Sequence, residues 1–179
     1  MMRKQTSILC TTASIAILSL APFNATAQQT RAQAVAGLRK VSPSEMDPTY
    51  TKAAPYAQEL VNRALARHRE VLLLAVHATP PGHGNVIVAS NFDRIGKRGD
   101  DDDMRCIRTG KPNLEVNGPH FEDEVVLKDA SGQTIGAIGV VFNYKPGEDK
   151  TPLIRAANEI EQEMSHVIQT PLSLYKTTK

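Results

Sequence analysis

Cysteine is nearly absent from this sequence, which limits what can hold the folded chain together. The chain has 179 residues and two cysteines, Cys10 and Cys106. Cys10 lies in an N-terminal apolar run that we expect to be removed, so Cys106 would be the only cysteine of the mature chain. A single cysteine excludes an internal disulfide, even in an oxidising compartment. We interpret Cys106 as a small buried hydrophobic residue rather than as a nucleophile.

An excess of charge of one sign is also missing. The whole chain carries 21 basic and 19 acidic residues, and removing Arg3 and Lys4 with the N-terminal run leaves 19 of each sign. A balanced chain lacks the strongly basic surface with which proteins bind nucleic acid. We therefore expect no nucleic-acid partner.

Recognised catalytic and metal-binding motifs are missing as well. The sequence has no C-x-x-C-H haem attachment, G-x-S-x-G elbow, phosphate-binding loop or H-E-x-x-H. Three histidines, His77, His83 and His120, are expected at strand ends or in loops and could converge on zinc or copper, but their separations match no metal motif. We expect no catalytic residue, cofactor or metal, and keep a metal-dependent or redox enzyme using these histidines as the alternative.

Long hydrophobic runs are limited to the N-terminus. The run from Ile8 to Phe23 follows two basic residues and precedes Ala25-Thr26-Ala27, which is the order of a secretory signal peptide. It is short for the roughly 20 residues that a membrane span needs. We therefore predict cleavage after Ala27 and a periplasmic or secreted protein that does not span the membrane when mature.

The rest of the chain divides into three parts. Residues 28–50 show no clear apolar stripe, which predicts a flexible lead-in after the signal peptide of residues 1–27. Residues 51–170 carry the periodic patterns of one folded domain, and residues 171–179 form a tail.

The strongest pattern that is present predicts a β-hairpin between Phe121 and Tyr144. Its first arm, residues 121–128, alternates between a mainly apolar face and a charged face, which predicts a half-exposed strand. Its second arm, residues 134–144, is apolar or small on both faces, which predicts a central strand covered on both sides. Asp129 to Gly132 supplies the turn. Gly136 and Gly139 indicate a bulge, a close-packed element or room for a ligand over the sheet.

The remaining patterns predict three helices and three further strands. Helical spacing predicts a long helix over residues 51–70, a short one over 101–108 and a C-terminal one from 151 to 168. Short apolar runs predict strands at 71–77, 85–90 and 114–117. This order favours an α+β domain with an antiparallel sheet of about five strands and helices mainly on one face.

Two segments resemble a known family. VIVASN, residues 86–91, and DASGQTIGAIGVV, residues 129–141, within this order of elements resemble the extracytoplasmic Cache domain, a PAS-like sensory fold, over residues 51–168. The resemblance implies a pocket between the sheet and the loops and short helix over it, for a small ligand such as an amino acid or carboxylate. A typical Cache receptor continues into a membrane helix and an output module, whereas this chain stops at Lys179 with no second apolar span. A stand-alone form that signals through a separate membrane receptor partner is therefore expected.

Candidate ligand-binding residues gather at the ends of the predicted buried strands. Arg94 can hold a carboxylate through two parallel hydrogen bonds, so we expect a small polar or anionic ligand there. The alternative is that Arg94 and Lys97 pair with the Asp100–Asp103 run. We interpret that run as a helix cap rather than a cation site. The full set of expected ligand-binding residues is His77, Ser90, Asn91, Arg94, Lys97, Asn143 and Tyr144.

Overall fold

The computed structural model describes residues 41–177 together with Arg31, Gln33 and Val35. The predicted signal peptide, its cleavage site and ten residues of the lead-in, 28–30, 32, 34 and 36–40, lie outside the described residues. Within the described part, no helix is both long enough and apolar enough to cross a membrane.

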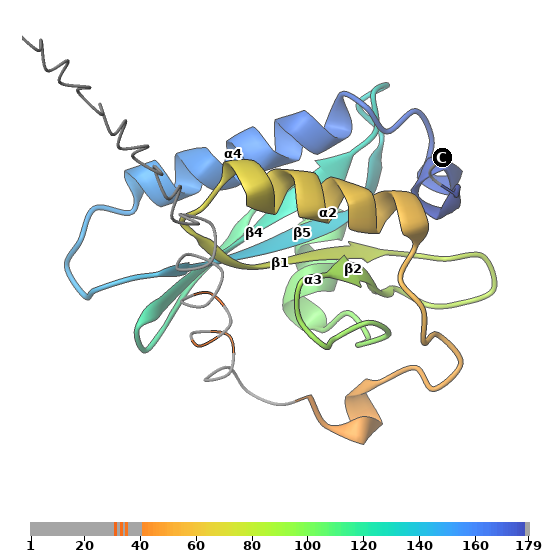
Figure 1. The fold of residues 1–179 in the computed structure, drawn as a ribbon, viewed down its shortest axis with the longest axis horizontal. Coiled ribbons are helices and arrows are strands. Elements are labelled where there is room, and N and C mark those ends of the chain that lie inside the picture. The colour runs from red at the N-terminus through yellow and green to blue at the C-terminus, as the bar shows by residue number, and fades with distance from the viewer. Residues whose placement is uncertain (1–30, 32, 34, 36–40, 178–179) are drawn as a thin grey trace, which may run out of the picture.

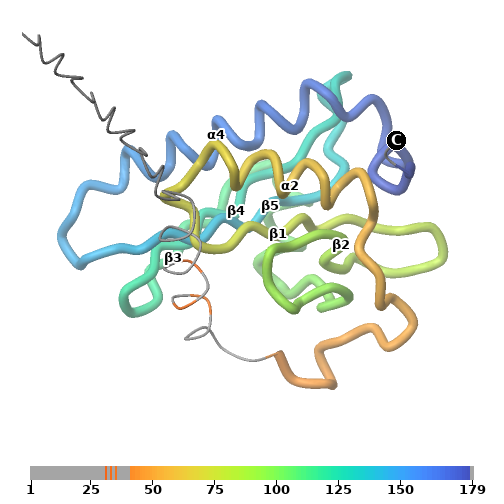
Figure 2. Tube along the Cα trace, in the orientation of Figure 1, coloured from red at the N-terminus to blue at the C-terminus, as the bar shows by residue number. Residues whose placement is uncertain are grey.

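Five strands form one antiparallel sheet, which confirms the predicted α+β class (Figures 1 and 2). The strand order is β2-β1-β5-β4-β3, so the predicted central strand is indeed central. The strands are β1 (Val71–Ala78), β2 (Val86–Ser90), β3 (Asn113–Asn117), β4 (His120–Lys128) and β5 (Thr134–Asn143). The three α-helices that follow residue 41 are α2 (Pro55–Arg67), α3 (Asp101–Thr109) and α4 (Thr151–Ser165).

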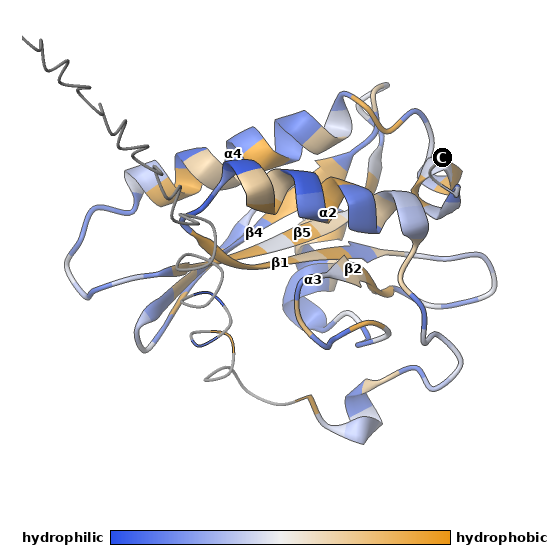
Figure 3. Ribbon diagram, in the orientation of Figure 1, coloured by the Kyte–Doolittle hydropathy of each residue, from blue (hydrophilic) through white to orange (hydrophobic). Residues whose placement is uncertain are grey.

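Helices α2 and α4 cover one face of the sheet (Figure 1). Each begins with proline in its first turn, where a missing N–H is tolerated. Their apolar stripes face the strands, and Figure 3 shows the outer sides of both helices as mainly hydrophilic. The largest buried side chains of this layer include Phe121, Phe142 and Ile160. This side of the sheet is therefore a closed hydrophobic core.

The other face of the sheet is only partly covered. Helix α3 packs on β4 and β5, where Cys106 and Ile107 contact Val126 and Ala137. The expectation that helices lie mainly on one face is thus met, with α3 as the exception. The prediction that Glu122 and Glu124 lie on an exposed face is wrong for Glu124, which is 6 % exposed. Helix α3 and the loop after β2 cover this part of the sheet.

The two mid-strand glycines of β5 have different surroundings. A side chain at Gly136 would collide with the backbone carbonyl oxygen of His77 on β1. At Gly139 a Cβ would meet only the Oε1 atom of Glu122, at 3.5 Å, an ordinary contact distance. Gly136 therefore allows close strand packing, whereas Gly139 leaves room above the sheet.

Segments on both sides of the predicted domain also join the fold. Residues 45–47 pair with residues 96–98 through the hydrogen bonds Asp47 N–H to Gly96 O and Arg98 N–H to Glu45 O, both 2.8 Å. We call residues 45–50 the strap. At the other end, residues 171–175 form a 3-10 turn that buries Leu174 against α2. The part of the lead-in that the structure describes and the start of the tail are thus packed against the domain.

Candidate functional site

A cavity of about 710 Å³ lies over the partly covered face of the sheet. Ligand pockets commonly enclose about 300–1,000 Å³. The floor is formed by β1, β5 and β4, where the small residues Ala75 and Gly139 are cross-strand neighbours. Leu73, Ile87 and Val141 make the apolar part of this floor. Small residues at the centre of the sheet therefore create the space.

The walls of the cavity are rich in carboxyl groups. Seven acidic residues line it, against two basic residues. The acidic residues are Glu45, Asp100, Asp102, Asp103, Glu115, Glu122 and Glu124, and the basic ones are Arg94 and Lys97. Burial raises the pKa of Glu122, and the nearby Arg94 guanidinium opposes that rise. Because a cation would stabilise the charged forms of these carboxyl groups, the excess of acidic residues favours a ligand that carries positive charge.

Arg94 and Lys97 lie on the loop that follows β2. The Arg94 guanidinium lies over the Phe92 ring, 5.2 Å from its centroid. Lys97 Nζ pairs with Asp100 Oδ2 at 3.0 Å, as the alternative interpretation expected for this lysine. Gly96, with φ +87°, lies between them against the Tyr50 carbonyl of the strap, where a side chain would collide. The strap therefore fixes the loop that carries both cations.

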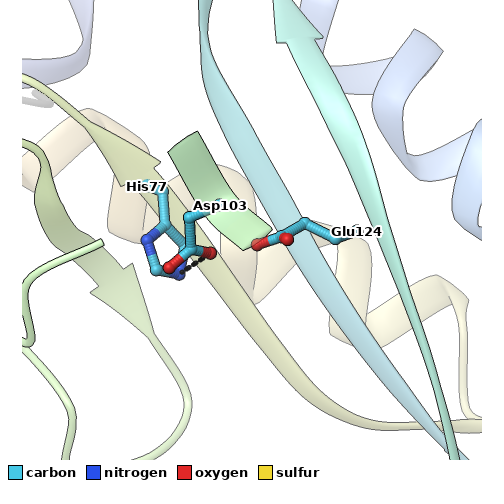
Figure 4. A group of neighbouring side chains, drawn as sticks. All are labelled: His77, Asp103 and Glu124. Carbon is cyan, nitrogen blue, oxygen red and sulfur yellow. Dashed lines mark ion pairs between the residues drawn. The ribbon is translucent and has the colours of Figure 1, made fainter. Parts of the chain in front are cut away.

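The most buried polar group of the site combines three side chains from three elements. His77 comes from β1, Asp103 from the first turn of α3 and Glu124 from β4, and Figure 4 shows them pointing toward one another. His77 Nε2 lies 3.3 Å from Asp103 Oδ1. One ligand atom from each of the three residues lies within 4.8 Å of the others. We call these three residues the buried triad.

The buried triad has unusual protonation. Burial lowers the pKa of His77, and the charge of Asp103 opposes this effect. Burial also raises the pKa of Glu124, and its hydrogen bond with the Asp103 carboxyl raises it further. Two carboxyl groups in contact cannot both ionise cheaply away from water, so one proton or one cation has to lie between them.

Of the seven predicted ligand-binding residues, His77, Arg94 and Lys97 line the cavity. Ser90 and Asn91 lie at the end of β2 and have structural roles instead. The Ser90 hydroxyl accepts the Phe92 N–H at 3.1 Å. The Asn91 side chain accepts from Leu74 N–H and donates to the Leu72 carbonyl, so it continues the hydrogen bonding of β1.

Asn143 and Tyr144 are also outside the cavity lining. Asn143 is exposed at the end of β5. Tyr144 packs on the helix side, with its ring 6.1 Å from that of Phe121 and its hydroxyl donating to the Glu148 carbonyl at 3.2 Å. Because adjacent strand residues face opposite sides, Tyr144 shares the face of Phe142 rather than that of Val141.

The three histidines do not form one metal site. His83 pairs with Asp47 of the strap, Nδ1 to Oδ2 at 3.0 Å, and its ring meets Tyr50 edge-on. His120 lines the cavity, but it is not part of the buried triad. Among the described residues, the one group of three or more His, Cys, Asp or Glu side chains with ligand atoms this close contains His77 alone of the three. The alternative interpretation, an enzyme in which these three histidines share one metal ion, is therefore wrong, because the three side chains do not converge.

The acidic run at the start of α3, Asp100–Asp103, has two roles, of which the sequence revealed one. Asp100 caps α3, accepting from the backbone N–H groups of Asp102 and Asp103, as predicted. The Asp103 carboxylate also accepts from the Asp100 N–H at 2.7 Å, and it faces His77 in the buried triad. Cys106 is buried and donates to the Glu124 carbonyl, and burial raises its pKa to about 12, which agrees with a non-nucleophilic role.

Sequence reasoning missed Asp103 and Glu124 as site residues. A signal for Glu124 was present, because it shares its strand face with Glu122 and, in the predicted hairpin, lies opposite Gly139. A glycine opposite a charged residue leaves room for a cavity over the sheet, so the charged side chain can be buried there instead of lying in solvent. Asp103 could not be chosen from the run, since its burial depends on where α3 packs.

Comparison with known proteins gives structural similarities at low sequence identity, to 18 solved chains. No family model matches the chain, and no curated protein matches its sequence. An inducer-binding domain of the PobR transcription factor from Acinetobacter, solved with 3-hydroxybenzoic acid, is 12% identical over 63% of this chain and 97% of that one, with a TM-score of 0.45. The A. aeolicus nlh2 GAF domain is 14% identical over 84% and 93%, with a TM-score of 0.45.

A third similar structure is the Agobacterium tumefaciens repressor BlcR. It is 12% identical over 62% of this chain and 67% of that one, with a TM-score of 0.40. None of the three is described as a Cache domain. Similarities of this size assign no function to this chain.

Proposed function

We propose that this chain is an exported, non-catalytic sensor domain of the Cache/PAS type that holds a small polar molecule in the cavity over its sheet. The observation that carries the proposal is the cavity of about 710 Å³, with an apolar floor and charged walls that converge on it. A preformed concave site with a few convergent polar groups is the usual form of a small-molecule site.

The charges of the lining support a more specific class of ligand than the sequence did. The sequence favoured an anion such as a carboxylate, on account of Arg94. The cavity keeps that guanidinium but adds seven carboxyl groups. The ligand that suits both sets carries an anionic group for Arg94 and a positive group for the acidic wall, as an amino acid or an amine-bearing acid does.

The signalling role is part of the same proposal. The strap hydrogen-bonds to the loop that carries Arg94 and Lys97, so ligand contact at this loop would alter the segment that leads into the domain. A separate membrane receptor would then read the liganded state. Export depends on the signal peptide expected at residues 1–27.

A test starts with the protein purified from the periplasmic fraction. A native mass spectrum shows whether a small molecule co-purifies, and thermal shift with a panel of amino acids, amines and carboxylates shows which class binds. A ligand that binds only the folded state raises the melting temperature as its concentration passes Kd. If no compound of any class shifts the melting temperature and none co-purifies, the proposal fails.

Arg94→Ala measures the anionic contact. Loss of a charge-assisted hydrogen bond is expected to weaken binding by ~1.5–3 kcal/mol, roughly tenfold to over a hundredfold. The matched control is Arg63→Ala, because Arg63 pairs with Glu59 on the outer side of α2, over the opposite face of the sheet, and does not line the cavity. Equal affinity of the two variants, measured by calorimetric titration, would remove Arg94 from the site.

A further inference from the structure

We propose that the buried triad, His77, Asp103 and Glu124, binds a divalent first-row transition-metal ion such as zinc, whose remaining coordination positions face the cavity. This goes beyond the binding of an organic ligand, because the ion needs no such ligand in order to bind. A metal at this place would also supply the positive charge that the acidic wall favours.

The spacing of the donor atoms fits such an ion. Zinc holds imidazole nitrogen and carboxylate oxygen at about 2.0–2.2 Å, which places neighbouring ligand atoms of a tetrahedral site roughly 3.3–3.5 Å apart. The distance from His77 Nε2 to Asp103 Oδ1 is already 3.3 Å. The Glu124 carboxyl lies within 4.8 Å of both donors. A rotation about the flexible Glu124 side chain would close the remaining gap.

A metal ion at the triad would take the place of the proton that the two carboxyl groups otherwise share. Glu124 is 6 % exposed and Asp103 is 3 % exposed, and a carboxyl oxygen of each lies within 4.8 Å of one of the other. The nearest ammonium group, Lys97 Nζ, is 4.0 Å from Asp103 Oδ2 and 3.0 Å from Asp100 Oδ2. Lys97 thus lies toward the outer carboxylate. Buried carboxylates are usually paired or bound to a metal, and Glu124 has no ion pair with a basic side chain among the described residues.

The histidine is oriented as a metal ligand would be. His77 is 4 % exposed, and its Nδ1 atom is buried without a hydrogen-bond partner among the described residues. The Asn85 side chain lies close to the same ring, and its Oδ1 atom is likewise buried without a hydrogen-bond partner among the described residues. The tautomer with the proton on Nδ1 would place an N–H on the side of Asn85 and leave the Nε2 lone pair, 3.3 Å from Asp103 Oδ1, available to a metal ion. Ligating histidines commonly donate their second N–H in this way.

The donor types select the class of metal. One imidazole and two carboxylates suit zinc and its first-row neighbours better than magnesium or calcium, which prefer oxygen alone. Three protein ligands with open positions toward a cavity match the arrangement of reactive rather than purely structural zinc sites. The open positions would accept water or a donor atom of the organic ligand.

The test is titration of the full mature chain, freed of metal by a chelator, with zinc alone. Calorimetry is expected to show one tight site per chain, with elemental analysis after dialysis giving one bound ion. Glu124→Gln keeps the shape of the side chain and removes its charge. Because loss of an outer-shell partner alone costs about 10–100-fold in affinity, loss of this ligand is expected to cost at least ~100-fold.

Two controls separate the triad from surface binding. Glu122→Gln changes a carboxyl of the same strand and cavity that is not in the triad, and because it removes only a neighbouring charge it should weaken zinc binding far less than Glu124→Gln. His83→Gln removes the more exposed pair with Asp47, where zinc could bind weakly. Equal affinity in Glu124→Gln and the unaltered protein, or no zinc bound at all, would overturn the proposal.

Folding and ligand binding are checked separately. If Glu124→Gln fails to fold by circular dichroism, His77→Gln replaces it as the diagnostic variant, and unchanged zinc binding there is equally contrary. Repeating the thermal-shift panel with metal-free protein tests the organic site by itself. Zinc binding can thus fail while the organic ligand binds, and the reverse.

Discussion

At the scale of single residues, Asp123 is the least satisfied side chain of the core. It is fully buried on the helix side of β4, and neither carboxyl oxygen has a hydrogen-bond partner among the described residues. Burial raises its pKa to about 7. An unpaired polar group in this position costs stability, and the cost is typically ~1–3 kcal/mol.

We therefore expect Asp123→Val to stabilise the protein. Valine has a similar volume and suits a strand, so its free energy of unfolding in urea at pH 7.5 should exceed that of the unaltered protein by about 1 kcal/mol or more. Asp123→Asn is the control, because the amide keeps the shape but stays unsatisfied. A less stable Asp123→Val would show that the carboxyl has a stabilising role.

The turn residue Asp129 presents the opposite case. Its Oδ1 atom accepts from Ser131 N–H, Ser131 Oγ–H and Gln133 N–H, at 2.9, 2.6 and 3.1 Å. These bonds lower the pKa of Asp129, so the charged form stabilises the folded state. This contribution is present above the ordinary aspartate pKa of about 3.9 and is lost as the pH falls through the lower folded value.

Asp129→Ala should accordingly lower the melting temperature at pH 7, and its difference from the unaltered protein should shrink in strong acid. Ser131→Ala removes one donor of the three bonds and should have a smaller effect. Melting curves from pH 7 down to pH 2 measure both. A difference that does not change with pH would mean that the carboxylate charge is not involved.

At the scale of elements, the two glycines of β5 carry different constraints. Gly136→Ala would push a methyl group into the His77 carbonyl, whose backbone cannot move freely. We expect a loss of ~1–3 kcal/mol of unfolding free energy, as in other overpacked cores. Gly139→Ala meets only Glu122 Oε1 at 3.5 Å, and it should be neutral or slightly stabilising.

The pair is its own control, since both changes add one methyl group to one strand. Denaturant unfolding of the two variants should give clearly different midpoints. Similar losses in both would contradict the placement of Gly139 on the cavity floor.

Element by element, the sequence was informative where local pattern decides structure. Alternation predicted the hairpin, and both faces of residues 134–144 being apolar predicted the central position of β5, because a central strand is buried on both sides. The helix expected over residues 51–70 is shorter, Pro55–Arg67, since proline sets its start. The residues that line the cavity were harder to predict from the sequence. Ser90 and Asn91 lie at the end of a buried strand and Arg94 follows it, but the side chains of Ser90 and Asn91 form hydrogen bonds with nearby backbone groups instead.

At the scale of the whole molecule, the compartment is a separate prediction. The exported protein should begin at Gln28, because Ala25-Thr26-Ala27 presents small residues at the expected cleavage site. N-terminal sequencing of protein from the periplasmic fraction checks this. Ala27→Arg should block processing and leave the chain in the membrane fraction, while Gln28→Ala should be processed normally. Mature protein that retains Met1 would contradict the prediction.

The strap couples the loop at the cavity mechanically to the N-terminal side of the domain. The loop bearing Arg94 and Lys97 is held by Asp47 and Glu45 through two backbone hydrogen bonds, with Gly96 pressed against Tyr50. A pulling force that separates residues 45–47 from the loop would loosen the loop. By linkage, a ligand bound to the loop would oppose this separation by the same coupling free energy by which the separation weakens ligand binding. Anchoring the protein at its N-terminal side would therefore make its affinity depend on force.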